Sequence, residues 1–125
     1  MSYMFQPKTC RFMLYGPFIE IITNQLQNLT FDPIDGVRLS FQCSGDECHR
    51  PVVIEIDPEG SISKLSVIEP TIHTAEMIFD FSNDELIFYG DSLELIVGHS
   101  IFHMLQQTIA SHYQAGHYSV TATAL

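Results

Sequence analysis

The sequence predicts an α+β fold, in which an antiparallel meander sheet of about five to six strands carries an N-terminal helix and a long C-terminal helix on one face. Two observations predict it. From about residue 36 to about residue 90, apolar and polar side chains alternate in short runs separated by turn signals, and segments with helical spacing lie on either side. The 125 residues are enough for one core, so we expect a single α+β domain over residues 1–125.

The first helix is predicted to begin at Gly16 and Pro17, because proline is favoured in the first turn of a helix. The apolar side chains that follow have roughly helical spacing: Phe18, Ile19, Ile21, Ile22, Leu26 and Leu29. The helix is therefore expected to bury one side against the sheet.

The middle of the chain is predicted to form hairpins. The runs "VRLSFQC" and "PVVIEI" are expected to pair across a four-residue connection, Ser44 to Glu47. The turn "DPEG" leads into "SISKLSVIE", and "AEMIFDF" and "ELIFYG" flank the turn "SND". These runs give five strands in meander order, and the final "YSVTATA" is expected to add a short closing strand.

The second helix is expected to begin near residue 92, with Asp91 and Ser92 as caps and Glu94 completing a capping box. It is expected to run to about Tyr113 and to end before Gly116. Its apolar stripe is predicted to contain Leu93, Val97, Ile101, Met104, Leu105 and Thr108.

The residues Gly90-Asp91-Ser92-Leu93 resemble the nucleophile block of the GDSL esterases and lipases, in which a serine at the end of a strand attacks an ester. In that family the block opens a longer chain, and an Asp-x-x-His block closes it. Here the block begins at residue 90 and no Asp-x-x-His follows. We therefore interpret these four residues as a strand end, a turn glycine and a helix cap.

The chain is acidic, with fifteen Asp and Glu residues against five Lys and Arg and a formal net charge of −10. The five basic residues are scattered, which argues against nucleic-acid binding and against docking on an anionic membrane. A basic protein partner would suit this charge. The N-terminus lacks the apolar run of a signal peptide and no stretch approaches membrane-spanning length, so we expect a cytoplasmic protein.

The stretch "CSGDECH" (residues 43–49) raises the question of a metal site or a redox pair. If Ser44 to Glu47 form a hairpin tip, Cys43 and Cys48 lie opposite each other. His99 and His103 are four residues apart on a predicted helix and share one side of it. A zinc site of Cys43, Cys48, His99 and His103 is thus one hypothesis, with a reversible disulfide and inert thiols as alternatives.

No catalytic motif stands out, so the leading hypothesis is a non-enzymatic protein that binds another macromolecule, as an adaptor, chaperone, inhibitor or immunity-type factor. A homodimer formed through the sheet is expected. The chain is similar to the type III secretion chaperones in size, acidity and helix-then-meander order. Two alternatives remain: a metal- or redox-responsive protein, and a protein with a small-molecule pocket beside the second helix that uses Ser92 or His112.

Overall fold

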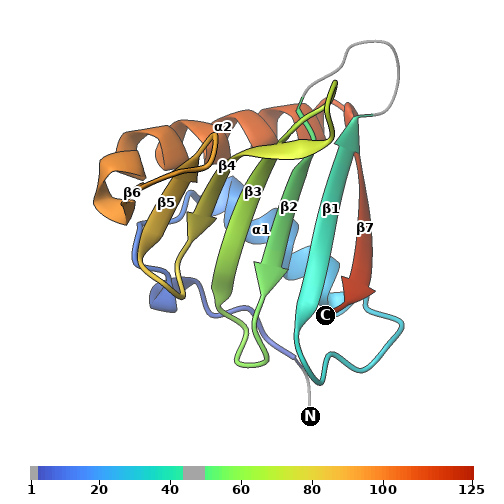
Figure 1. The fold of residues 1–125 in the computed structure, drawn as a ribbon. Coiled ribbons are helices and arrows are strands. Elements are labelled where there is room, and N and C mark those ends of the chain that lie inside the picture. Colours follow the sequence, from blue (N-terminus) through green and yellow to red (C-terminus); the bar gives the residue numbers. More distant parts are fainter. Residues whose placement is uncertain (1–2, 44–49) are drawn as a thin grey trace.

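The computed structural model, which describes residues 3–43 and 50–125, confirms the α+β class: one antiparallel sheet carries two helices on one face (Figure 1). The sheet has seven strands, slightly more than the sequence predicts. The elements, in chain order, are η1 Pro7–Thr9, α1 Gly16–Gln27, β1 Val37–Cys43, β2 Val52–Ile56, β3 Ile62–Glu69, β4 Thr74–Asp80, β5 Glu85–Phe88, β6 Asp91–Glu94, η2 Leu95–Gly98, α2 His99–Gln114 and β7 Tyr118–Ala124.

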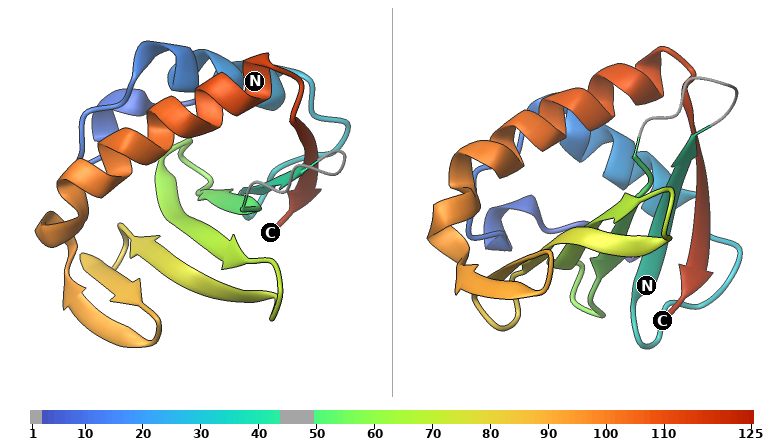
Figure 2. Two further views of the ribbon diagram at one scale, coloured as in Figure 1. Left: turned by 90° about the horizontal axis from the view of Figure 1, so that it is seen from above. Right: turned by 45° about the horizontal axis from the view of Figure 1, so that its top comes forward.

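The strands follow the order β6-β5-β4-β3-β2-β1-β7. Strands β1 to β5 form the predicted meander, and β6, which was not predicted, extends it by one strand. The closing strand β7 returns to pair with β1, from Tyr118 opposite Cys43 to Ala124 opposite Val37. The sheet curls toward the helices without closing into a barrel, so β6 and β7 are its two edges (Figure 2).

Alternation along the strands places the core between the sheet and the helices. On β1, for example, Val37, Leu39 and Phe41 are buried, whereas Arg38 and Gln42 are exposed. Helix α1 buries Phe18, Ile21, Ile22 and Leu26 against this face, as its spacing predicts.

The start of the second helix was predicted wrongly. Residues 91–94 form the short edge strand β6, a 3₁₀ turn follows, and α2 begins at His99. Tyr89 and Gly90 connect β5 to β6 and both have positive φ, 48° and 86°. Two positive φ values in a two-residue loop match a type I′ hairpin turn, which continues the sheet instead of starting a helix. Asp91, Ser92 and Glu94 are therefore strand residues and cap nothing.

The side of α2 that faces the core also differs from the prediction. The buried residues of α2 are Phe102, Gln106, Ile109 and Ala110. Most of the predicted apolar stripe is exposed instead.

The N-terminal segment before α1 explains why this side of α2 turns inward. The side chain of Gln106 accepts a hydrogen bond from the Tyr15 backbone N–H (2.6 Å) and donates one to the Met13 carbonyl (3.1 Å). The ring of Phe102 packs against Phe12 from the same segment at a centroid distance of 5.5 Å. The buried Gln106 side chain thus forms hydrogen bonds with two backbone groups that would otherwise have no partner.

Candidate functional site

The start of α2 and the two elements before it expose a stripe of large apolar side chains. Each is between 42% and 65% exposed: Leu93 on β6, Ile96 and Val97 on η2, and Ile101 and Met104 on α2. We call these five residues the α2 apolar surface. Since α2 already buries Phe102, Ile109 and Ala110, it carries apolar side chains on two sides, and only one of them is used by the fold.

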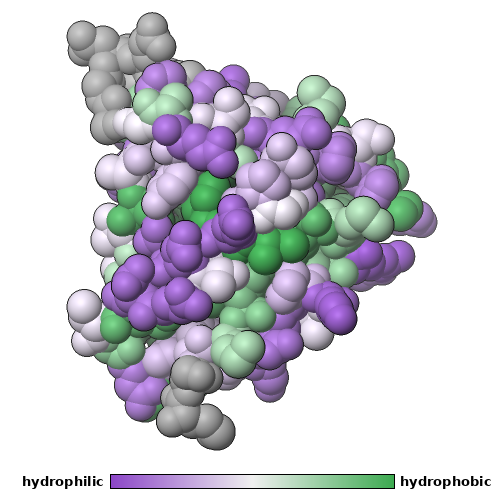
Figure 3. All heavy atoms as spheres, turned by 180° about the vertical axis from the view of Figure 1, so that it is seen from behind, coloured by the Kyte–Doolittle hydropathy of each residue, from purple (hydrophilic) through white to green (hydrophobic). Residues whose placement is uncertain are grey.

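Several exposed large apolar side chains on adjoining elements, as here, are typical of binding sites. Seen from the helix side, hydrophobic side chains gather in patches among hydrophilic ones, including at the edge of the face where α2 begins (Figure 3). Met104 adds a flexible side chain that can adapt to the shape of a partner.

A shallow groove of about 290 Å³ lies farther along α2, between the helix and the concave face of the sheet. Leu105, Thr108 and Ile109 form its helix side, and Val52 and Val67 form its sheet side. Leu105 and Thr108 belong to the predicted stripe. Leu105 is partly buried against the core, whereas Thr108 is exposed.

An ion pair lies at the end of this groove. The Arg50 guanidinium, which lines the groove, contacts the carboxylate of Glu76, and its distance to the Glu69 carboxylate is 3.9 Å. The Glu76 side chain is only 12% exposed. Glu76 lies on β4 where the register of β3 with β4 shifts by one residue. A carboxylate that is this buried is normally paired, and Arg50 supplies the pairing.

The charge of this half of the chain is one-sided. No Lys or Arg follows Lys64, whereas seven acidic residues do: Glu69, Glu76, Asp80, Asp84, Glu85, Asp91 and Glu94. Asp91 and Glu94 are exposed on β6, next to Leu93 of the apolar surface. Glu94 also lies opposite Glu85 of β5, which concentrates negative charge at this edge. Carboxylates thus lie at the β6 end of the α2 apolar surface.

The structure separates the described members of the predicted metal site. His99 lies at the start of α2, where its ring packs on Phe12 at 5.0 Å. Cys43 lies opposite Tyr118 in the pairing of β1 with β7, and Tyr118 follows the C-terminal end of α2. His112 lies beside Tyr118 and so marks the end of α2 that approaches Cys43. His103 is nine residues before His112, which corresponds to about 13 Å along a helix. Among the described residues, no group of three or more His, Cys, Asp or Glu is placed to hold a metal ion.

Cys48, the fourth predicted ligand, lies outside the described residues, as do Ser44 to Glu47 and His49. The observed pairing of β1 with β2 extends to Phe41 opposite Val52. The metal or redox role of Cys43, Cys48, His99 and His103 stays a prediction.

His112 and His117, and not His99 and His103, lie at the end of α2 that approaches Cys43. His112 and His117 stack with a ring centroid distance of 5.6 Å, and His112 also meets the ring of Tyr118. Since β7 carries Tyr118 back beside Cys43, the chain order of α2 and β7 brings these rings near β1. Helical spacing alone favoured His99 and His103, because it contains no information about which end of α2 approaches β1.

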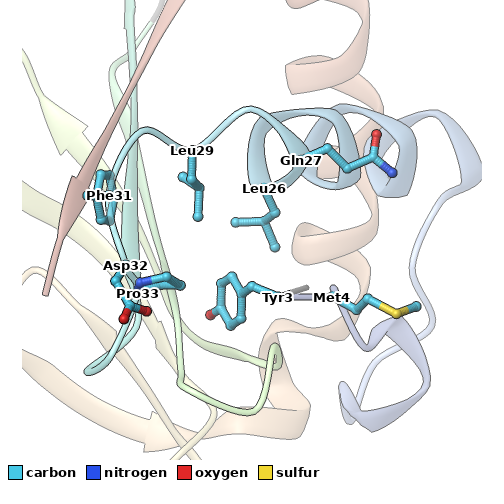
Figure 4. A pocket seen from close by; sticks show the side chains of 8 residues that line it. All are labelled: Tyr3, Met4, Leu26, Gln27, Leu29, Phe31, Asp32 and Pro33. Carbon is cyan, nitrogen blue, oxygen red and sulfur yellow. The ribbon is translucent and has the colours of Figure 1, made fainter. Parts of the chain in front are cut away.

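Ser92 and His112, the two residues considered for a small-molecule pocket, lie in different places. His112 lines the groove between α2 and the sheet, whereas Ser92 is exposed on the edge strand β6. A larger cavity of about 540 Å³ lies between the N-terminal segment, the end of α1 and the loop that follows (Figure 4). Its lining includes Leu26, Leu29 and Phe31, and its Tyr3 hydroxyl already donates to the Asp57 carbonyl. The lining also contains the polar residues Gln27 and Asp32.

No helix in the described part of the chain has both the length and the apolar character needed to cross a membrane.

Comparison with known proteins gives a structural match. No family model matches the chain, and no curated protein sequence matches it. The fold is similar to the solved structure of the conserved hypothetical protein VC1805 from pathogenicity island VPI-2 of Vibrio cholerae O1 biovar eltor strain N16961, with a TM-score of 0.73 and 14% sequence identity. The match covers 96% of this chain and 100% of the other, which is described as sharing structural homology with the human P32 protein. At this identity the likeness concerns the fold alone.

Proposed function

We propose that this protein acts by binding another protein, as an adaptor, chaperone, inhibitor or immunity-type factor, and that its partner presents a basic amphipathic segment to the α2 apolar surface. The exposure of Leu93, Ile96, Val97, Ile101 and Met104 on adjoining elements is the observation that carries the proposal. Apolar side chains of a partner would cover these residues, in the way an amphipathic helix fills a hydrophobic groove.

The carboxylates at the β6 end of the α2 apolar surface determine the charge of the partner. Asp91 and Glu94 lie on the strand that carries Leu93, and neither takes part in an ion pair within the described part of the chain. Arg11 reaches the same edge, where it pairs with Asp84. Lys or Arg side chains on the polar side of a bound segment would meet these carboxylates, whereas an acidic segment would be repelled. The net charge of −10 would also speed the encounter with a basic partner.

A model peptide tests the proposal without knowledge of the natural partner. The probe is a fluorescein-labelled helical peptide of about 18 residues with leucines on one side and lysines on the other, and the matched peptide has glutamate in place of every lysine. Fluorescence anisotropy is expected to show binding of the lysine peptide that weakens as salt is added, and no binding of the glutamate peptide.

The variant Ile101→Ser with Met104→Ser is expected to weaken binding of the lysine peptide at least about tenfold, because interface energy concentrates in a few apolar contacts. The matched control is Met13→Ser with Ile72→Ser, which removes two apolar side chains that are 85% and 62% exposed elsewhere. Unchanged affinity in the Ile101 and Met104 variant, or equal affinity for the two peptides, would contradict the proposal.

A further inference from the structure

The two edges of the sheet differ in a way that bears on self-association. An edge strand presents unpaired backbone groups, and natural proteins usually protect it by shortness, charge or proline. The edge strand β6 has four residues and two carboxylates, from Asp91 and Glu94. The other edge strand, β7, has seven residues with the sequence YSVTATA, which contains no charge and no proline. Of shortness, charge and proline, β7 has none, although the segment between α1 and β1 runs beside one end of it (Figures 1 and 2).

The backbone groups that face outward from β7 can be identified. The Leu125 N–H donates to the Gly36 carbonyl (3.2 Å), which continues the pairing of β7 with β1 by one residue. Because the bonding direction alternates along an antiparallel strand, Thr121 and Thr123 also direct their backbone groups to β1. Val120 and Ala122 direct theirs outward, and no described strand pairs with this side of β7.

We propose that β7 pairs with β7 of a second copy of this chain, in an antiparallel arrangement whose twofold axis passes through Thr121. Val120 of one copy then lies opposite Ala122 of the other, and these two symmetric pairs form about four hydrogen bonds between outward-facing groups. Thr121 lies opposite Thr121, a favourable cross-strand pair. The sheet continues from one copy into the next, and since each copy has one β7 the assembly closes as a dimer.

Charge favours a dimer formed by pairing of β7 with β7 over a dimer formed by pairing of β6 with β6. Each chain carries a net charge of −10, so two copies repel wherever their acidic surfaces meet. Antiparallel pairing of β6 with itself would set Asp91 opposite Glu94, whereas pairing of β7 brings no charged residue of the strand into register. The inference is independent of the proposed function, because it uses a different edge of the sheet from the α2 apolar surface.

Analytical ultracentrifugation of the full chain, up to about 200 μM, is the first test, because a small polar interface is expected to give weak association. The wild type is expected to sediment as a monomer and dimer in equilibrium. Thr121→Lys and Thr121→Glu are each expected to sediment as monomers, since both place like charges opposite each other at the twofold axis. An equimolar mixture of the two variants is expected to restore the dimer, which a folding defect would not do.

Ser92→Lys is the matched control, because it adds the same charge at an exposed position on the opposite edge strand and is expected to leave the dimer intact. Thr121→Lys reduces the overall negative charge, so its loss of dimer would be a local effect. Ala122→Pro gives a second route, since it removes one outward N–H without breaking a bond to β1. A monomeric wild type at every concentration, an open polymer, or a dimer that persists in Thr121→Lys would overturn the proposal.

Discussion

Gln106 is a polar residue of α2 that links the helix to the segment before α1. It is fully buried, and both ends of its amide bond the backbone of residues 13–15. Helical spacing puts Gln106 on the side of α2 that carries His99 and His103, away from the predicted apolar stripe. Its burial and its two hydrogen bonds show that this side of the helix faces the N-terminal segment.

Gln106→Leu is expected to lower the free energy of unfolding by about 1–3 kcal/mol, since the Tyr15 N–H and the Met13 carbonyl would lose their partner in a buried position. Urea unfolding followed by circular dichroism measures the change. Gln107→Leu, at the exposed neighbouring position, serves as the control and is expected to shift stability by no more than about 0.5 kcal/mol. Equal effects of the two substitutions would show that the Gln106 bonds contribute nothing.

At the scale of single elements, α2 is where sequence and structure disagree most. Its apolar residues satisfy two overlapping helical patterns, one through Ile101, Met104 and Leu105 and the other through Phe102, Ile109 and Ala110. Periodicity identifies both and does not rank them. The choice depends on Phe12, Phe79 and Phe81, which all pack against Phe102 with centroid distances of 5.1–5.5 Å. These contacts join segments distant in sequence.

Two neighbouring substitutions test which side of α2 supports the fold. Phe102→Ala is expected to cost about 3–5 kcal/mol of stability, because it leaves a cavity among packed aromatic rings. Ile101→Ala is expected to cost less than about 1 kcal/mol, since Ile101 is 42% exposed. Thermal or urea unfolding compares the two variants. A larger loss in Ile101→Ala would mean that the stripe predicted from the sequence is the one that packs.

Most of the hairpins were predicted correctly, as was the buried side of α1, whereas the buried side of α2 was not. Strands β1 to β5 lie in the predicted runs and order, because alternation and turn residues are local signals. Strand β6 was missed because the sequence after Gly90 also resembles a helix start, and the type I′ turn that decides the matter has Tyr89 at a position where φ is positive. A residue other than Gly, Asn or Asp at that position is not a recognisable turn signal.

At the scale of the whole molecule, acidity and buried tyrosines together make the fold sensitive to alkaline pH. Burial raises the pKa of Tyr3 to about 12, and the carboxylates of Asp57 and Glu59 add to the effect. Burial, together with the charge of the Cys43 thiolate, raises the pKa of Tyr118 to about 12. The folded state therefore favours the neutral phenols more than the unfolded state does.

The stabilisation from these two phenols is complete below pH 10, their ordinary pKa, and is lost as the pH rises from 10 toward 12. The melting temperature is thus expected to fall steeply over this interval. Tyr3→Phe and Tyr118→Phe each lose a hydrogen bond to a carbonyl, of Asp57 and Arg50 respectively, so they start less stable. Their melting temperatures should then fall less steeply, and slopes as steep as that of the wild type would contradict this account.

The amino-acid sequence by itself determined the fold class, the N-terminal helix, the order of the first five strands and the net negative charge. These properties follow from composition and from local periodicity, which each segment carries within itself. The tertiary structure decided that β7 pairs with β1, that Gln106 and Phe102 face inward, and that the apolar residues from Leu93 to Met104 remain exposed. Those outcomes depend on contacts between distant segments, where several locally acceptable arrangements compete and packing selects one.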